Sequence, residues 1–72
     1  MATGTLARIE ATPARLVVGY SDESWYLCDA LGVIVSRVPL NSLECARLVD
    51  AGRLTVERRI SADTVLYRLH HG

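Results

Sequence analysis

The sequence contains no Lys, no Phe and no Gln, and its 72 residues include only two Cys and two Pro. Its positive charges are therefore all Arg, and the eight Arg are balanced by eight Asp and Glu. A chain without net charge has no overall attraction to nucleic acid or to an anionic membrane surface. This balance makes nucleic acid a less favoured partner than protein.

Long apolar runs and a secretory signal are also absent. No run approaches the roughly 18–20 apolar residues that a membrane-spanning helix needs. Residues 1–5 contain neither a basic segment nor the apolar core of a signal peptide. We therefore expect a cytoplasmic protein with no membrane partner.

Cys28 and Cys45 are the only cysteines. In a cytoplasmic protein they are expected to be buried free thiols that act as small hydrophobic side chains. The alternative is a disulfide or a reactive pair. Their spacing with His70 and His71 matches no common zinc pattern. We therefore expect no metal and no cofactor.

Catalytic motifs are missing as well. The sequence has no nucleophile beside a recognisable base, no Gly-rich phosphate loop and no carboxylate pair in a defined setting. It contains no linker or internal repeat, which indicates a single domain over residues 1–72. Because such a short domain has little room to enclose a substrate, we expect a protein that is not an enzyme.

One segment carries a helical start, period and stop. Asn41 is a suitable N-cap, and Glu44 stands three residues later, as in a capping box. Gly52 provides the left-handed residue that ends many helices. These signals predict a helix over residues 41–52. Its apolar side is expected to consist of Cys45, Ala46, Leu48 and Val49.

β-branched and alternating segments on both sides of this helix predict strands. We expect them at residues 5–11, 14–20, 25–29, 33–38, 54–60 and 65–71. A short helix over residues 21–31 is an alternative to the third strand, but a hairpin fits the β-branched segment that follows more simply. The order ββββαββ predicts an α+β fold, in which a small curved antiparallel sheet packs on one helix.

Both faces of this sheet are expected to be largely apolar, because both sets of alternating residues in the segment 25–38 are hydrophobic. One helix covers only one face. The sheet must then curl into a small barrel or place its second face against another chain. Exposing that face would forfeit about 25 cal/mol per Å² in a domain with little stability to lose. We therefore expect a homodimer or an obligate complex.

Five residues are candidates for the partner-binding surface: Trp25, Leu43, Arg58, Leu66 and Arg68. Trp is a preferred anchor at interfaces, and Leu43 stands among the polar residues of its helix. Leu66 lies on the less apolar side of the last strand, beside Arg68. Strand alternation groups Arg58 with the apolar residues of its strand, where an Arg needs an acidic partner or an interface. The apolar residues grouped with Arg58 in this strand are Leu54, Val56 and Ile60.

The second half of the chain resembles a winged-helix regulator, in which a recognition helix is followed by a two-stranded wing. The resemblance rests on Leu48, Ala51, Gly52, Leu54, Val56, Tyr67, Arg68 and Leu69. It implies DNA binding through the 41–52 helix and the 54–71 hairpin, with Arg47, Arg53, Arg58 and Arg59 as contacts. The chain departs from the family at Pro39, which precedes the helix, and in having no room for the usual leading helices.

The sequence is most typical of a small interaction protein that binds a macromolecule and blocks or bridges it. Its partner is expected to be a second copy, a larger protein or a ribonucleoprotein complex. The lack of Lys, Phe and Gln beside abundant Ala, Arg, Val and Leu indicates a GC-rich bacterial or phage coding sequence. In size and composition the chain is similar to phage-encoded inhibitors of host machinery, such as anti-CRISPR proteins.

Overall fold

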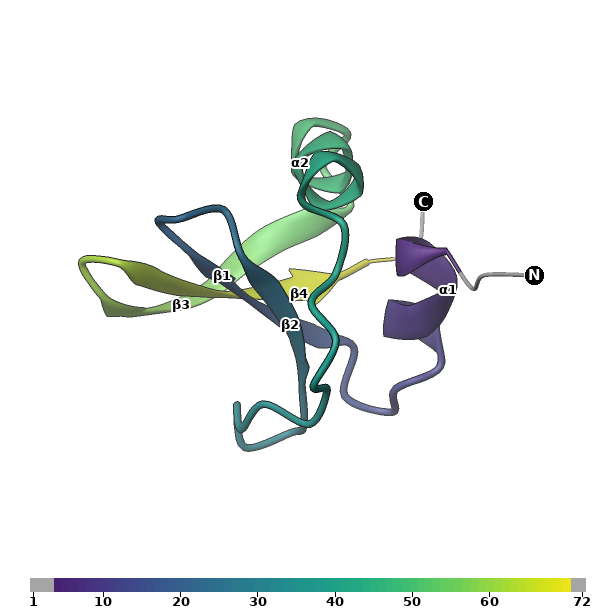
Figure 1. Ribbon diagram of the computed structural model, residues 1–72, viewed down its shortest axis with the longest axis horizontal. Coiled ribbons are helices and arrows are strands. Elements are labelled where there is room, and N and C mark those ends of the chain that lie inside the picture. The colour runs from purple at the N-terminus through teal and green to yellow at the C-terminus, as the bar shows by residue number, and fades with distance from the viewer. Residues whose placement is uncertain (1–3, 71–72) are drawn as a thin grey trace.

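A computed structural model of the protein describes residues 4–70. Its four strands form a single antiparallel sheet, and its two helices lie beside this sheet (Figure 1). The sheet is open, with the strand order β2-β1-β4-β3. The predicted α+β class is confirmed. The elements are α1 (Thr5–Glu10), β1 (Leu16–Tyr20), β2 (Trp25–Cys28), α2 (Ser42–Asp50), β3 (Leu54–Ser61) and β4 (Thr64–Leu69).

The predicted central helix is confirmed as α2, with both of its expected ends. The Asn41 side chain accepts a hydrogen bond from the Glu44 amide at 2.9 Å. Gly52 has a φ of +76°, and the Arg53 amide donates to the Leu48 carbonyl at 2.9 Å. This is the 6→1 bond of a Schellman motif, which satisfies a carbonyl that the helix end would leave open.

The first element is a helix, so the strand predicted over residues 5–11 is wrong. Leu6 and Ile9 stand three residues apart and therefore share one side of a helical turn. Ile9 is fully buried in the core. The turn ends where the Thr12 hydroxyl donates to the Ile9 carbonyl at 2.7 Å. Six residues are too few for helical periodicity to stand out from weak alternation.

The two helix N-termini are joined through side chains. The Thr5 amide donates to Glu44 Oε2 at 3.1 Å, and the Asn41 amide donates to the Thr5 hydroxyl at 3.2 Å. In a capping box within one helix, the Glu44 carboxylate would instead return to the Asn41 amide. The cap is therefore completed by a residue far away in the sequence, and this ties α1 to α2.

This junction makes part of the stability depend on pH. Hydrogen bonding to Thr5 holds the pKa of the Glu44 carboxyl below its ordinary value of 4.5. Its contribution is therefore fully present above pH 4.5 and is lost as the pH falls through the folded-state pKa. We expect Glu44→Gln to lower the free energy of unfolding near neutral pH. We expect the difference to disappear in acid, where both side chains are uncharged.

Urea unfolding of the two proteins between about pH 7 and about pH 3 measures this difference. Glu10→Gln is the matched control, because Glu10 is exposed and makes no side-chain hydrogen bond within residues 4–70. A stability difference for Glu44→Gln that stays constant with pH would show that the carboxylate charge has no part in the junction.

Residues 33–38 do not form the predicted return strand, which is a second correction. They contribute only one β-bridge, between Ile34 and Cys28. The Asp29 carboxylate accepts hydrogen bonds from the Leu31 amide at 2.9 Å and the Val33 amide at 3.0 Å. This turn lies where a hairpin would have its turn, and the backbone bonds from Asp29 to Val33 and from Val35 to Leu27 begin the pairing. Beyond Val35 the Ser36 hydroxyl donates to the Val38 carbonyl at 2.7 Å instead, and the pairing ends.

The buried residues form two clusters on opposite faces of the sheet. On the helix face, residues of both helices pack against Val17, Leu27, Leu54 and Leu69. On the second face, a smaller cluster forms without a helix. The first cluster is Ile9, Val17, Leu27, Leu40, Cys45, Leu54 and Leu69, and the second is Leu16, Val18, Cys28 and Leu66.

The two cysteines are buried free thiols, as expected, and they belong to different clusters. Burial raises the pKa of the Cys45 thiol to about 12 and also raises that of Cys28. Both are therefore protonated and act as small core residues. Neither helix within residues 4–70 is long and apolar enough to cross a membrane.

Candidate functional site

A β-bulge in β3 decides which face of the sheet Arg58 occupies. Val56 pairs with Tyr67, and Arg58 pairs with Leu66, which leaves Glu57 as an extra residue between them. A bulge of this kind shifts the alternation of the side chains that follow it by one, here up to the second register shift between Arg59 and Ser61. Arg58 therefore lies on the second face with Leu66. The prediction that it shares a side with Val56 is wrong, because strict alternation cannot reveal a bulge.

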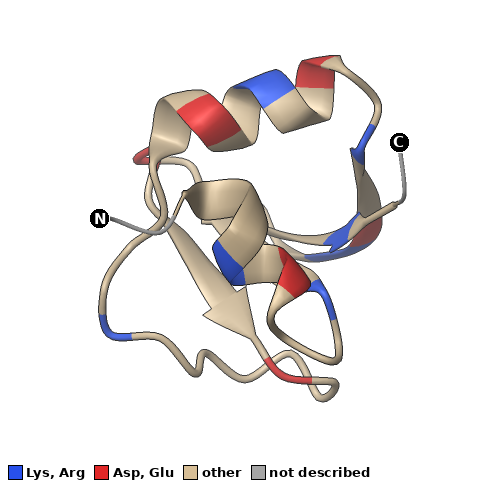
Figure 2. Cartoon of the chain, turned by 90° about the vertical axis from the view of Figure 1, so that its right-hand side faces the viewer, with Lys and Arg blue, Asp and Glu red and all other residues tan. Residues whose placement is uncertain are grey.

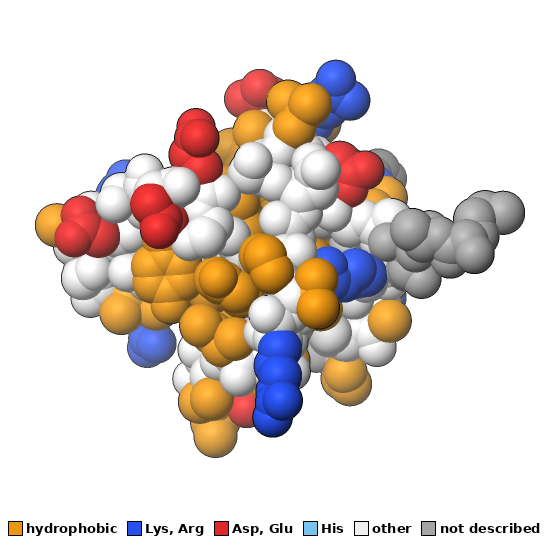
Figure 3. Space-filling model, viewed as in Figure 1, with side chains coloured by type: hydrophobic (Ala, Val, Ile, Leu, Met, Phe, Trp, Pro, Cys, Tyr) orange, Lys and Arg blue, Asp and Glu red, His pale blue; other side chains and the backbone are white. Residues whose placement is uncertain are grey.

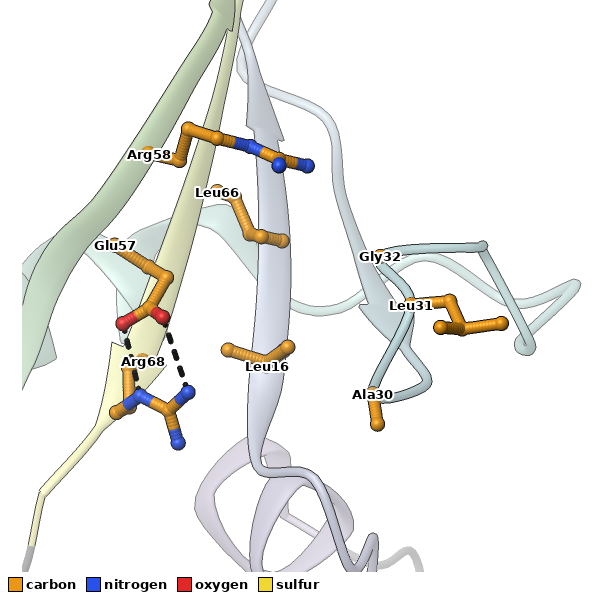
Figure 4. Close-up of a pocket in the computed structure, with 8 residues that line it drawn as sticks. All are labelled: Leu16, Ala30, Leu31, Gly32, Glu57, Arg58, Leu66 and Arg68. Atoms are coloured by element: carbon orange, nitrogen blue, oxygen red, sulfur yellow. Dashed lines mark hydrogen bonds and ion pairs between the residues drawn. The ribbon is translucent and has the colours of Figure 1, made fainter.

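This shift completes a pocket of about 330 Å³ on the second face (Figure 4). Leu16 and Leu66 form its apolar floor, and each is only 4% exposed. Figure 4 shows Arg58 extending from β3 across the neighbouring strands, with Leu66 beside it, towards the turn that follows β2. The pocket is lined by Leu16, Ala30, Leu31, Gly32, Glu57, Arg58, Leu66 and Arg68.

Gly32 closes the side of the pocket opposite β3. It has a φ of +81°, which ends the turn that the Asp29 carboxylate begins. A Cβ placed on Gly32 would lie 3.8 Å from the Leu66 side chain and 4.0 Å from Nη2 of Arg58. The Arg58 guanidinium therefore reaches the backbone of the turn, and the two walls of the pocket nearly meet.

Glu57 and Arg68 form an ion pair at one edge of the pocket. Arg68 donates two hydrogen bonds to the carboxylate, from Nε at 2.9 Å and from Nη2 at 3.1 Å. Hydrogen bonding to Arg68 lowers the pKa of Glu57, and the same bond raises the pKa of Arg68. The two side chains are 39% and 44% exposed, so the pair adds little to stability. It does neutralise the charge of both groups.

Arg58 is the charged group of the pocket that remains available. Its guanidinium makes no hydrogen bond or ion pair within residues 4–70, although, with the hydrogen bond from Arg68, its charge also helps to lower the pKa of Glu57. Two Arg and one Glu line the pocket, so its formal charge is +2 − 1 = +1. An Arg has five N–H donors in a planar fork, which matches a carboxylate. The pocket thus combines an apolar floor with one unpaired cation.

An exposed apolar loop adjoins this pocket. We call residues 31–38 the apolar loop, because five of them carry large hydrophobic side chains that are 41–83% exposed. Figure 3 shows hydrophobic side chains gathered over the middle and lower parts of the molecule, where the connection from β2 to α2 runs. The five side chains belong to Leu31, Val33, Ile34, Val35 and Val38.

Side-chain and backbone hydrogen bonds hold the apolar loop in place. Arg8 of α1 donates to the Val38 carbonyl at 2.8 Å, to the Ser36 hydroxyl at 2.9 Å and to the Pro39 carbonyl at 3.2 Å. Further backbone bonds connect the loop and the residues after it to β2. The loop is therefore a fixed surface, and the conformational entropy of its backbone is already lost when the domain folds.

Trp25 and Leu43 lie together at a second, separate place. They line a hollow of about 380 Å³ with Tyr20, Glu23, Ser42 and Ala46. Leu43 is 60% exposed, but Trp25 is half-buried. Its ring packs against the helix-face cluster and lies 5.1 Å from the Tyr67 ring. Trp25 thus supports the core as well as the surface, whereas the sequence indicated a surface anchor.

The five candidate residues are therefore divided between two places. Arg58, Leu66 and Arg68 meet at the pocket on the second face, and Trp25 and Leu43 meet at the edge of the helix face. Leu66 is buried in the floor of its pocket and offers little surface. Sequence reasoning did not identify Leu16, because it reads as an ordinary core residue.

The four arginines proposed for DNA contact do not form one surface. Arg47 lies on α2, over the helix face, and Arg58 lies on the second face. The Arg53 guanidinium is engaged with the His70 carbonyl at 3.3 Å. Figure 2 shows the Arg positions spread over helix, strand and loop. The helix-then-hairpin order of a winged helix is present in α2, β3 and β4, but a strand hairpin precedes it.

Comparisons with protein-family models, with curated proteins and with solved structures found no match. No group of three or more His, Cys, Asp or Glu among residues 4–70 is placed to hold a metal ion. The pocket and the apolar loop are therefore the candidate functional surfaces.

Proposed function

We propose that this protein is a non-enzymatic interaction module that binds a macromolecular partner through the apolar loop. The main support is that residues 31–38 combine exposed apolar side chains with an ordered backbone. Five large hydrophobic side chains are exposed there, and Arg8 together with β2 holds the backbone that carries them. A surface ordered in advance loses less entropy on binding than a flexible one.

An interface with a partner explains the exposed side chains of this loop better than a role in covering the domain's own core does. The helix-face cluster is already closed by α1 and α2, and the side chains of the loop point outward from it. A domain of this size is only marginally stable. Contiguous exposed apolar surface on a small protein typically marks an interaction site. Burying these five side chains in an interface would recover their transfer free energy.

The chemistry of the loop favours a protein partner. Its side chains are aliphatic, and the scattered arginines offer no continuous track for a phosphate backbone. A second copy of the chain is the first partner to test. In the other form of the same proposal, the chain is a phage- or mobile-element-encoded inhibitor that binds and blocks a larger host complex. This form of the proposal includes a cytoplasmic location.

The double substitution Val33→Ser/Val35→Ser tests this proposal. Both residues are 57% exposed, so we expect the domain to stay folded. Self-association is measured by analytical ultracentrifugation, and other partners by photo-crosslinking in cells with quantitative mass spectrometry. We expect the variant to weaken the complex at least about tenfold, as loss of central apolar contacts does.

Val56→Ser is the matched control, because Val56 is 53% exposed but lies on β3. We expect it to bind as the wild-type chain does. Equal binding by the double variant, or loss of binding through Val56→Ser alone, would remove the apolar loop as the contact surface.

A further inference from the structure

We infer that the pocket on the second face binds a carboxylate group that is attached to an apolar body. Within a protein complex, the occupant is an acidic side chain of the partner that lies next to an apolar residue. The pocket shares Leu31 with the apolar loop, so a segment lying on the loop can reach it. This identification of the occupant rests on the proposed function, whereas the carboxylate site itself does not.

The charge of the pocket selects a single negative charge. Arg68 is satisfied by two hydrogen bonds to Glu57, whereas Arg58 has no such partner within residues 4–70. One carboxylate would bring the pocket from +1 to neutral. A phosphate dianion would exceed this charge and would also face the Glu57 carboxylate at the pocket edge.

The apolar lining of the pocket selects an apolar attachment. Leu16 and Leu66 form the floor but are almost completely buried, so an apolar ligand would lie mainly against Ala30 and Leu31, of which Leu31 is 83% exposed. Apolar surroundings exclude water and strengthen a charge-assisted hydrogen bond. A ligand that covers the floor would therefore also protect the bond between its carboxylate and Arg58.

A simpler role for Arg58 makes a different prediction. Its aliphatic stem can cover Leu66 while its guanidinium remains in water, as long cationic side chains commonly do. In that case the pocket would not distinguish a carboxylate from a neutral molecule of the same shape. The comparison of hexanoate with 1-hexanol separates the two roles, because these molecules differ mainly in charge.

The experiment is an NMR titration of the complete ¹⁵N-labelled chain at constant ionic strength. We expect hexanoate to shift the amide signals of Gly32, Arg58 and Leu66 along one saturating curve. We expect 1-hexanol and inorganic phosphate to bind at least about tenfold more weakly, because each lacks one of the two recognised features. Equal binding of 1-hexanol or of phosphate would overturn the inference.

Arg58→Gln should weaken hexanoate binding at least about tenfold, and Arg58→Lys should lose part of it, because Lys keeps the charge but not the planar fork. Arg59→Gln is the matched control, since Arg59 pairs with Val65 on the row of the helix face. The spectra themselves report folding. Unchanged affinity in Arg58→Gln, or equal losses in Arg58→Gln and Arg59→Gln, would contradict the assigned site.

The two proposals fail in different ways. If hexanoate binds the wild-type chain but Val33→Ser/Val35→Ser leaves the complex intact, the apolar loop is rejected as the contact surface and the carboxylate site is kept. Loss of the complex in that double variant, with no hexanoate binding to the wild-type chain, would keep the loop and reject the carboxylate site.

Discussion

Leu66→Ala should lower the free energy of unfolding by about 2–5 kcal/mol, which is the usual range for truncating a buried Leu. Leu66 is only 4% exposed and lies in the cluster with Leu16, Val18 and Cys28. The truncation would remove apolar contacts and leave a cavity in the floor of the pocket. Because small domains have about 5–15 kcal/mol of stability in total, this loss is large. Urea unfolding followed by far-UV circular dichroism measures it.

Leu43→Ala is the matched control for this prediction. Leu43 is 60% exposed on α2, so the same truncation should change stability by no more than about 0.5 kcal/mol. A loss for Leu66→Ala as small as the one expected for Leu43→Ala would mean that the second face has no core of its own. The pair also compares two residues that the sequence places on one partner-binding surface and the structure places at two separate sites.

The parts of the fold that sequence reasoning predicted correctly depend on neighbouring residues. Helix α2 is bounded by the side chain of Asn41 and the positive φ of Gly52, and both signals lie within a few residues of the helix. The β3–β4 hairpin follows likewise from two β-branched segments and a short turn. Local signals of this kind can be read without knowledge of the tertiary structure.

The parts that it missed depend on contacts between distant residues. Residues 33–38 have strong β propensity, but Arg8 binds three groups of this segment and its neighbour, 28 to 31 residues away in the sequence. Thr5 completes the cap of α2 in the same way. Propensity is a weak guide where tertiary hydrogen bonds compete with it.

The excess of apolar side chains predicted from the sequence is resolved in two ways. Part of it is buried by the additional helix α1 and by the cluster on the second face. The remainder is concentrated in the apolar loop, whereas the sequence indicated a whole sheet face. The candidate site could not be located in advance, because the bulge at Glu57 decides that Arg58 joins Leu66.

Gly19→Ala should destabilise the domain by about 1–3 kcal/mol, the usual cost of overpacking. Gly19 pairs with Trp25 across β1 and β2, and the indole covers the glycine. A Cβ on Gly19 would lie 2.9 Å from Cζ3 and 3.0 Å from Cε3 of that ring. The ring cannot move away freely, because it packs against Tyr67 at 5.1 Å. Either the strands separate or the ring contact is lost.

Fluorescence adds a second readout, because Trp25 is the only Trp of the chain. We expect Gly19→Ala to shift its emission and to lower the urea midpoint together, since one displacement causes both. Gly4→Ala is the matched control: a Cβ there meets nothing within 4 Å, and Gly4 is the N-cap of α1, so we expect only the small loss of a poorer N-cap and no shift in emission. If Gly19→Ala kept wild-type stability and emission, the indole would not lie over β1. The hollow shared by Trp25 and Leu43 would then have a different shape.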